Sequence, residues 1–291
     1  MKRAGSVDPR KNQPVFLLDS RPMTAPGYVH GYTEEEATRL ADQAGTLTEL
    51  LHHDTNYPTG CQVLEAGCAV GAQTRILARR SPGAHFTSVD VSAQSLALAR
   101  EAIKREGLCN VEFKQADLFA LPFTEASFDH VFVCFVLEHL RQPEQALRAL
   151  LRVLRPGGSL TVIEGDHGSA FFHPRSQRAT RTIECLGQAQ AAAGGDALIG
   201  RRLYPLLRSV SLPDVQVSPR FVYADASRPG WVDGFTRKTF IAMVEGAEEP
   251  ALRLGLIDKL AWDCGIADLK RTAEDDGSFC YTFFKAVAHK P

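Results

Sequence analysis

The sequence has 291 residues, of which 44% are hydrophobic, and its 33 Lys and Arg residues nearly balance 34 Asp and Glu residues. This hydrophobic content is enough to bury a sizeable core, which excludes a largely disordered chain. The formal net charge of −1 argues against a broad basic face that binds nucleic acid. The seven scattered cysteines include no C-x-x-C pair, so we expect neither a disulfide framework nor a zinc site, and we expect a reducing, cytoplasmic location.

The first 27 residues contain four prolines and no apolar stretch of the kind that a signal peptide needs. They predict a flexible N-terminal arm, whose apolar patch Val15–Leu18 would allow contact with a second copy and hence a homo-oligomer. The longest apolar run, Val131–Leu137, is far shorter than the ~20 residues of a membrane helix, so no membrane partner is expected.

From Thr33 onward, short apolar strands alternate with amphipathic helices. Thr33 and Glu36 form a capping box at the start of the first predicted helix, because each side chain can satisfy a free backbone donor of that turn. The spacing then predicts strands over 63–64, 85–91, 111–116, 128–135 and 160–163, and helices over 72–80, 92–106 and 137–154. This alternation predicts an α/β fold with a mostly parallel, doubly wound sheet.

The C-terminal part has a different pattern. Residues 165–213 predict helix, loop and helix without a strand, and a long helical stretch follows over 231–269. Two late strands, over 215–223 and 279–288, would pair antiparallel at the sheet edge.

The richest stretch for function is Glu65-Ala-Gly-Cys-Ala-Val-Gly71, which links the first strand to a helix. Its glycines are spaced G-x-x-x-G, whereas a dinucleotide site favours G-x-G-x-x-G around a pyrophosphate. Glu65 would also repel a phosphate, and its carboxylate suits a ligand with a cationic amino-acid end. The dinucleotide interpretation, and with it a nicotinamide dehydrogenase, is therefore disfavoured.

Acidic residues follow the next two strands. Asp90 ends the second strand, where a carboxylate can accept both ribose hydroxyls of a nucleoside. Asp117 and Leu118 follow the third strand and suit an adenine amine and ring face. Each Asp alone is also compatible with a helix cap.

These motifs, together with two later ones, resemble the successive motifs of class I S-adenosylmethionine-dependent methyltransferases, in the small-molecule branch that includes ubiquinone- and menaquinone-biosynthesis enzymes. The motifs are Glu65–Gly71, Asp90, Asp117–Leu118, Phe128–Asp129 and Leu154–Gly158, and the resemblance spans about Tyr28 to Asp166. It implies a Rossmann-like seven-stranded sheet with helices on both faces, an antiparallel last strand and a helical cap within residues 165–271. The methyltransferase domain would cover residues 28–291.

The resemblance also implies site residues for S-adenosylmethionine, whose product is S-adenosylhomocysteine. Asp90 would bind the ribose, Asp117 and Leu118 the adenine, and Phe135 would lie beside the sulfonium. The remaining cofactor contacts would come from Tyr28 as a lid residue and from the turn and its helix, at Glu65, Gly67, Gly71 and Gln73. At Ala69 the family commonly has Gly, so we expect slightly weaker or shifted binding.

Candidates for chemistry follow the fifth strand. His167 can act as a general base near neutral pH, and Glu164 as a base or as a stabiliser of a developing cation. A metal pair of His167 and His173 lacks a convincing third ligand, so no metal is predicted.

The acceptor is expected to be a small apolar or aromatic metabolite bound by aromatic and polar side chains of the C-terminal part. The proposed substrate-binding residues are His139, Phe171, Tyr204 and Trp231. Whether carbon, nitrogen or oxygen is methylated stays open. A non-catalytic cofactor-binding protein is the alternative, since no acceptor-side motif is diagnostic.

Overall fold

The computed structural model describes residues 34–291, so the predicted arm over 1–27 and Tyr28 lie outside the described residues. Seven strands form one sheet in the order β3-β2-β1-β4-β5-β7-β6. The pairs among β1 to β5 are parallel, and β7 lies antiparallel between β5 and β6. The strands are β1 (Gln62–Ala66), β2 (His85–Asp90), β3 (Val111–Gln115), β4 (Phe128–Cys134), β5 (Leu154–His173), β6 (Val215–Asp225) and β7 (Ser278–His289). The predicted α/β sheet with an antiparallel last strand is confirmed.

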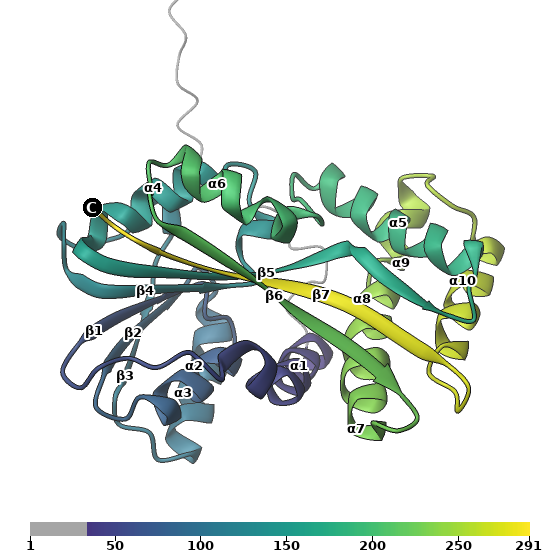
Figure 1. The fold of residues 1–291 in the computed structure, drawn as a ribbon, viewed down its shortest axis with the longest axis horizontal. Helices are drawn as coiled ribbons and strands as arrows, with labels where there is room; N and C mark the ends of the chain where they lie inside the picture. Colours follow the sequence, from purple (N-terminus) through teal and green to yellow (C-terminus); the bar gives the residue numbers. More distant parts are fainter. Residues whose placement is uncertain (1–33) are drawn as a thin grey trace, which may run out of the picture.

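Helices cover both faces of the parallel part of the sheet (Figure 1). On one face lie α1 (Glu34–His52), α2 (Ala72–Arg80) and α3 (Ala93–Arg105), and on the other α4 (Pro143–Val153) and α6 (Leu203–Ser209). In α3 the buried Leu96, Ala99 and Ile103 recur at helical spacing, and the Ser92 hydroxyl caps the helix by accepting from the Ser95 amide.

The sheet continues beyond its parallel part as an extension made of β5 from Gly165, β7 up to Thr282, and β6 from Phe221. Helical segments gather around this extension (Figure 1). They are α5 (Gln177–Ala192), η3 (Ile199–Arg202), α7 (Pro229–Trp231), η4 (Val232–Ile241), α8 (Ala242–Glu245), α9 (Glu248–Arg253) and α10 (Lys259–Arg271). The segment η4 is a π-helix, a rare conformation that is frequent at functional sites.

Two sequence-based boundaries are wrong. The prediction that 165–213 holds no strand fails because β5 runs on to His173 and pairs with β7 across an irregularity between Asp166 and Phe171. Two glycines and three charged or polar residues within 164–168 interrupt the apolar pattern, although the strand is buried there. The predicted helix over 137–154 is instead a short 3₁₀ turn, η2 (Leu137–His139), followed by α4, because Pro143 favours the first turn of a helix.

The core lies on both faces of the sheet. On β4, Phe132 packs into one hydrophobic cluster, whereas Val131 and Val133 pack into the other. A strand buried on both faces is expected to be continuously apolar, which explains its sequence.

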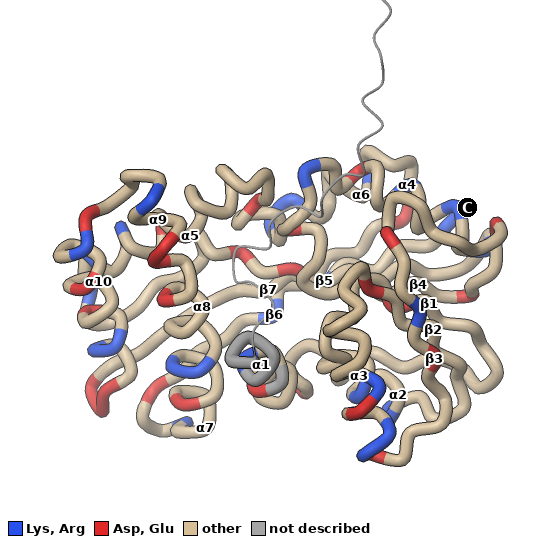
Figure 2. The backbone as a smooth tube through the Cα atoms, turned by 180° about the vertical axis from the view of Figure 1, so that it is seen from behind, with Lys and Arg blue, Asp and Glu red and all other residues tan. Residues whose placement is uncertain are grey.

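The surface mixes charges of both signs. Figure 2 shows acidic and basic residues interspersed along the chain. Within residues 34–291, no helix combines the length and apolarity that a membrane crossing requires. All seven cysteines are free thiols.

Candidate active site

The turn after β1 is shaped by its glycines. Gly67 and Gly71 adopt φ of +77° and +76°, which side chains rarely allow. A Cβ at Gly67 would also lie 2.5 Å from Cγ2 of Val136, which follows β4. The turn is held to β2 by the Gly67 amide, which donates to the Val89 carbonyl at 2.8 Å. Substitution at Gly67 would therefore close the space between the ends of β1 and β4.

Glu65 is 2% exposed at the end of β1. Its Oε2 accepts from the Thr74 hydroxyl at 2.6 Å and from the Ser88 hydroxyl at 2.7 Å. Burial raises the pKa of Glu65 to about 7, against the lowering effect of these two hydrogen bonds. A cation placed beside this carboxyl would favour its ionised form.

Asp90 fastens the turn to the end of β2. One of its carboxylate oxygens accepts from the Ala69 amide and the other from the Ser92 amide, both at 2.9 Å. Burial raises the pKa of Asp90, although these backbone donors oppose the rise. Ala69 itself has φ of +45°, the left-handed conformation that the expected Gly would adopt without strain.

The residues after β3 serve structural roles in the protein without ligand. Exposed Asp117 caps the 3₁₀ helix η1 (Leu118–Ala120) by accepting from the Phe119 amide at 2.9 Å. The Leu118 side chain packs into the core. Their contacts with an adenine stay predictions.

Two further cofactor candidates lie near this edge. Gln73 Oε1 is 2.7 Å from Nε2 of His52, and this contact joins α2 to α1. Phe135 follows β4 with φ of +57°, and its ring centroid is 5.4 Å from that of Phe283.

The carboxyl ends of β1, β2 and β4 therefore meet around one glycine turn. β1 lies between β2 and β4 in the sheet, which is the switch point where α/β sheets bind ligands. The glycine turn leaves a space that Cβ atoms would fill, and carboxylates lie at two strand ends beside it. These features fit the nucleoside cofactor implied by the resemblance, whose cationic amino-acid end would lie beside Glu65.

Glu164 is fully buried and holds the segment after β4. Its Oε1 accepts from the amides of Val136 and Leu137 at 3.0 and 2.8 Å. Its Oε2 is buried without a hydrogen-bond partner among the described residues. Burial and then the neighbouring Glu138 carboxylate raise the pKa of Glu164 well above its usual range. This geometry gives Glu164 a positioning function, and its direct role in chemistry stays a prediction.

His167 lies in a buried chain of three side chains. Its Nδ1 is 2.7 Å from the Tyr281 hydroxyl, and its Nε2 is 3.6 Å from a Glu138 carboxylate oxygen. The Glu138 carboxylate is also held by the Gln190 amide at 3.4 Å. Burial lowers the pKa of His167, against the raising effect of Glu138, so the imidazole is neutral near pH 7. The contact with Glu138 is too long for a hydrogen bond and acts as charge stabilisation.

The side chains of Glu138, His167 and Tyr281 border a small cavity of about 50 Å³. Its walls are mainly aromatic and apolar, and it is lined in part by Phe135, His139, Phe235, Phe240 and Phe283. Of the predicted substrate residues, His139 therefore lies at the cavity, 3.4 Å from Glu138.

The other predicted substrate residues lie elsewhere. Phe171 and Tyr204 are 58% and 54% exposed, and neither lines the small cavity. Phe171 stacks on exposed Phe221 of β6. Trp231 packs against the core at the start of η4. Their role in substrate binding stays a prediction.

Sequence reasoning missed Tyr281 as a site residue. It is 114 residues from His167 in the chain, and no local motif marks it. The alternation of Tyr281 and Phe283 along the predicted last strand was the available signal, since both face one side of the sheet.

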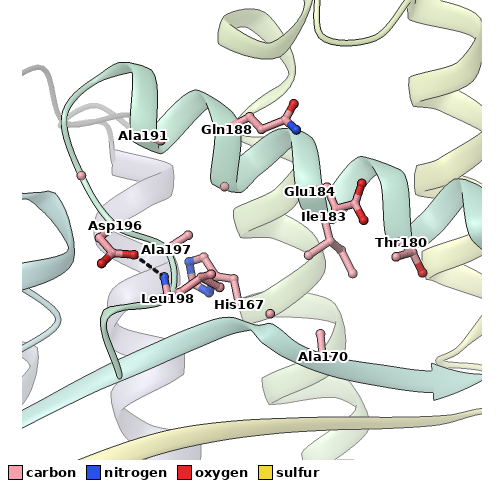
Figure 3. Close-up of a pocket in the computed structure, with 13 residues that line it drawn as sticks. His167, Ala170, Thr180, Ile183, Glu184, Gln188, Ala191, Asp196, Ala197 and Leu198 are labelled. Carbon is pink, nitrogen blue, oxygen red and sulfur yellow. Dashed lines mark hydrogen bonds between the residues drawn. The ribbon is translucent and has the colours of Figure 1, made fainter. Parts of the chain in front are cut away.

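A larger cavity of about 460 Å³ lies between α5 and β5 (Figure 3). Its lining includes Ala170 of β5, Ile183 and Gly187 of α5, and Leu198 of the following loop. His167 lines both this cavity and the smaller one.

Residues 64–162 match the family model described as a methyltransferase domain. The chain is 30% identical over 178 residues to the ubiquinone/menaquinone biosynthesis C-methyltransferase UbiE of Pseudomonas paraeruginosa, which covers 54% of this chain and 68% of that protein. It is 36% identical over 126 residues to methyltransferase GfsG of Streptomyces halstedii, covering 43% of this chain and 45% of that one. The chain spans less than half the length of several curated relatives that it matches.

The fold is similar to that of phosphoethanolamine N-methyltransferase 2 of Haemonchus contortus in complex with phosphomonomethylethanolamine and S-adenosylhomocysteine. The TM-score is 0.53 at 20% identity, and the alignment covers 85% of this chain and 53% of that chain. This likeness extends the match from the parallel strands to most of the chain.

Proposed function

Because the chain belongs to the class I S-adenosylmethionine-dependent methyltransferases, we propose that it transfers a methyl group from S-adenosylmethionine to a small apolar or aromatic acceptor. The acceptor's reacting group would lie in the small cavity beside Phe135, where the end of β4 meets the middle of β5.

The cofactor supplies a methyl group already activated by a sulfonium. The chain's own contribution is to orient the reactants and to exclude water. Asp90 and Asp117 are the proposed partners of the ribose and the adenine, and Glu65 lies where the amino-acid end is expected. Glu65, Asp90 and Asp117 lie at or just after the ends of three different strands, so together they would fix the ligand along the sheet edge.

The observation that carries the proposal is the buried chain of Glu138, His167 and Tyr281 beside this edge. The Glu138 carboxylate can only accept, so it favours a proton on Nε2 of His167. Nδ1 is then left to accept from the Tyr281 hydroxyl. The imidazole is therefore neutral and poised to take up a proton.

Such a chain suits an acceptor with an O–H, N–H or acidic C–H group. When the acceptor takes the methyl group, with S-adenosylhomocysteine as the leaving group, the acceptor proton would pass to the Tyr281 oxygen while the Tyr281 proton passes to Nδ1 of His167. Glu138 would stabilise the imidazolium that results. General-base assistance of this kind contributes about 10²- to 10⁴-fold to a rate.

Calorimetric titration with S-adenosylhomocysteine tests the cofactor half of the proposal. We expect wild-type binding and at least about 100-fold weaker binding for Asp90→Ala, since two ribose hydroxyls lose a charged acceptor. Asp225→Ala, at the far end of β6, is the matched control and should bind as wild type. Absence of wild-type binding, with a native circular dichroism spectrum, would refute the proposal.

Transfer of a labelled methyl group to a panel of phenols, enols and amines tests catalysis. Binding without transfer to any member would favour the alternative of a non-catalytic S-adenosylmethionine-binding protein.

A further inference from the structure

The larger cavity has no place in the cofactor site. We propose that it is a binding compartment for the apolar body of a neutral acceptor whose reacting group lies on the other side of His167. This inference rests on the proposed function and adds to it the substrate class: an acceptor with a small protic head and an extended apolar part.

Size separates the two cavities. The small cavity, at about 50 Å³, has room for a few water molecules or a small reacting group and not for a whole metabolite. The larger cavity, at about 460 Å³, lies within the usual range of small-molecule pockets. An acceptor that reacts in the first therefore needs further space, and the second adjoins it.

His167 connects them. It lines both cavities, and its imidazole is hydrogen-bonded to the Tyr281 hydroxyl and lies 3.6 Å from the Glu138 carboxylate. Figure 3 shows His167 on β5, below α5 and next to Ala197 and Leu198 of the loop. A ligand that extends along this imidazole would keep its reacting group near the base and its body under α5.

The lining favours an apolar, uncharged body. The α5 residues Thr180, Ile183, Gly187 and Ala191 recur three or four positions apart and so share one face. Leu198 is 39% exposed at the rim, an apolar surface that a ligand would cover. Within residues 34–291 the lining contains no Lys or Arg, and its two carboxylates, Glu184 and Asp196, are paired with arginines outside the lining. The lining therefore offers no free cation to an anionic ligand.

A homologous series of 4-alkylphenols, from 4-methylphenol to 4-octylphenol, tests the compartment by calorimetry on the protein saturated with S-adenosylhomocysteine. We expect affinity to rise about fourfold per added methylene, which corresponds to about 0.8 kcal/mol per buried CH₂. The rise should stop when the chain fills the cavity.

Two blocking variants and one matched control locate the effect. Ala191→Phe and Gly187→Leu place bulk on the cavity face of α5, and should flatten the series to less than about twofold per methylene. Ala192→Phe adds the same bulk one residue away, where the side chain does not line the cavity, and should behave as wild type.

The outcomes are distinguishable. A flat series in wild type, or equal loss in Ala191→Phe and Ala192→Phe, overturns the compartment even when S-adenosylhomocysteine binds normally. Failure of S-adenosylhomocysteine to bind refutes the proposed function instead, and the series is then repeated without it. A rise confined to wild type and Ala192→Phe supports the compartment.

Discussion

The two halves of the site are built in different ways. The cofactor half consists of the segments after β1 to β4, where carboxylates accept hydrogen bonds from backbone amides. Asp117 bonds its own loop, and Asp90 bonds its own loop and the neighbouring glycine turn. The acceptor half consists of the sheet extension with α5 and η4, where Glu138, His167 and Tyr281 are buried and contact one another.

This difference sets what a substitution can do. A carboxylate bonded to its own loop and facing a ligand site can be removed with a local effect on binding. A side chain buried among other polar side chains leaves partners unsatisfied when it is removed, so folding and chemistry change together. We therefore expect separable effects in the cofactor half and coupled effects in the acceptor half.

The largest predicted effect lies where the segment after α1 meets β6 and β7. Lys285 of β7 is 3% exposed and donates to Asp54 at 2.6 Å, and Arg220 of β6 pairs with the same carboxylate. Asp54→Ala would leave a buried ammonium with only the Thr55 hydroxyl and the Leu51 carbonyl as acceptors. We expect a loss of about 3 kcal/mol in the free energy of unfolding, measured by urea denaturation.

Controls separate burial from charge. Asp233→Ala removes a half-exposed pair with Lys238 and should cost less than about 1 kcal/mol. Adding Lys285→Met to Asp54→Ala should recover much of the loss. Equal losses for Asp54→Ala and Asp233→Ala would contradict the assignment.

Acid should weaken the same contacts of Asp54 with Lys285 and Arg220. Burial favours a higher pKa for Asp54, but Lys285 and Arg220 lower it to about 2. A carboxyl with a lowered pKa stabilises the fold above its unfolded pKa of about 4 and loses that contribution as the pH falls toward 2. Asp54→Asn should remove this part of the acid transition.

Glu65 gives the next largest effect and tests whether the cofactor half is separable. Its pKa of about 7 means that the carboxyl is mostly protonated at pH 6 and mostly ionised at pH 8. A ligand ammonium favours the ionised form, so binding releases a proton. We expect S-adenosylhomocysteine to bind about tenfold more weakly at pH 6 than at pH 8. Glu65→Gln should abolish this dependence without lowering the melting temperature, and a persistent dependence would assign it to another group.

The two halves of the site also differ in how much of them can be predicted from the sequence. Glu65, Gly67 and Asp90 could be predicted as cofactor residues because each stands at or just after a strand end beside a recognisable turn. The fold was found from the same alternation of strands and helices. Tyr281 was missed because its role arises only when β7 inserts beside β5 and brings it to His167.

The position of Phe171 and Tyr204, two predicted substrate residues that lie outside the small cavity, has a related cause. Aromatic side chains such as Phe171 and Tyr204 indicate a pocket only if their elements turn them inward, and this depends on strand register. Phe171 lies on β5 beyond the irregularity after Asp166, with its ring on Phe221 at the surface. The composition of the segment therefore did not reveal which aromatic residues line the cavity.

The acceptor half makes its own electrostatic prediction. Glu138 raises the pKa of His167 against the larger lowering effect of burial. Glu138→Gln should therefore lower the pKa of His167 further, measured by ¹⁵N NMR titration of the imidazole nitrogens. Glu184→Gln, at the larger cavity, is the matched control and should leave this titration unchanged. No change in Glu138→Gln would remove Glu138 from the chain of proton-handling residues.

The smallest effect returns to the glycine turn, where a single methyl group distinguishes this chain from the pattern it resembles. Ala69 and Ala126 both adopt positive φ, at +45° and +51°, but only the Ala69 amide binds Asp90. Ala69→Gly and Ala126→Gly should each raise the free energy of unfolding by about 0.5–1 kcal/mol, because relief of the left-handed strain exceeds the entropy cost of Gly. Only Ala69→Gly should also tighten S-adenosylhomocysteine binding, by about two- to fivefold, since it changes the loop that holds the ligand. A gain in stability without a gain in affinity would mean that the Ala69 methyl strains the turn but does not narrow the site.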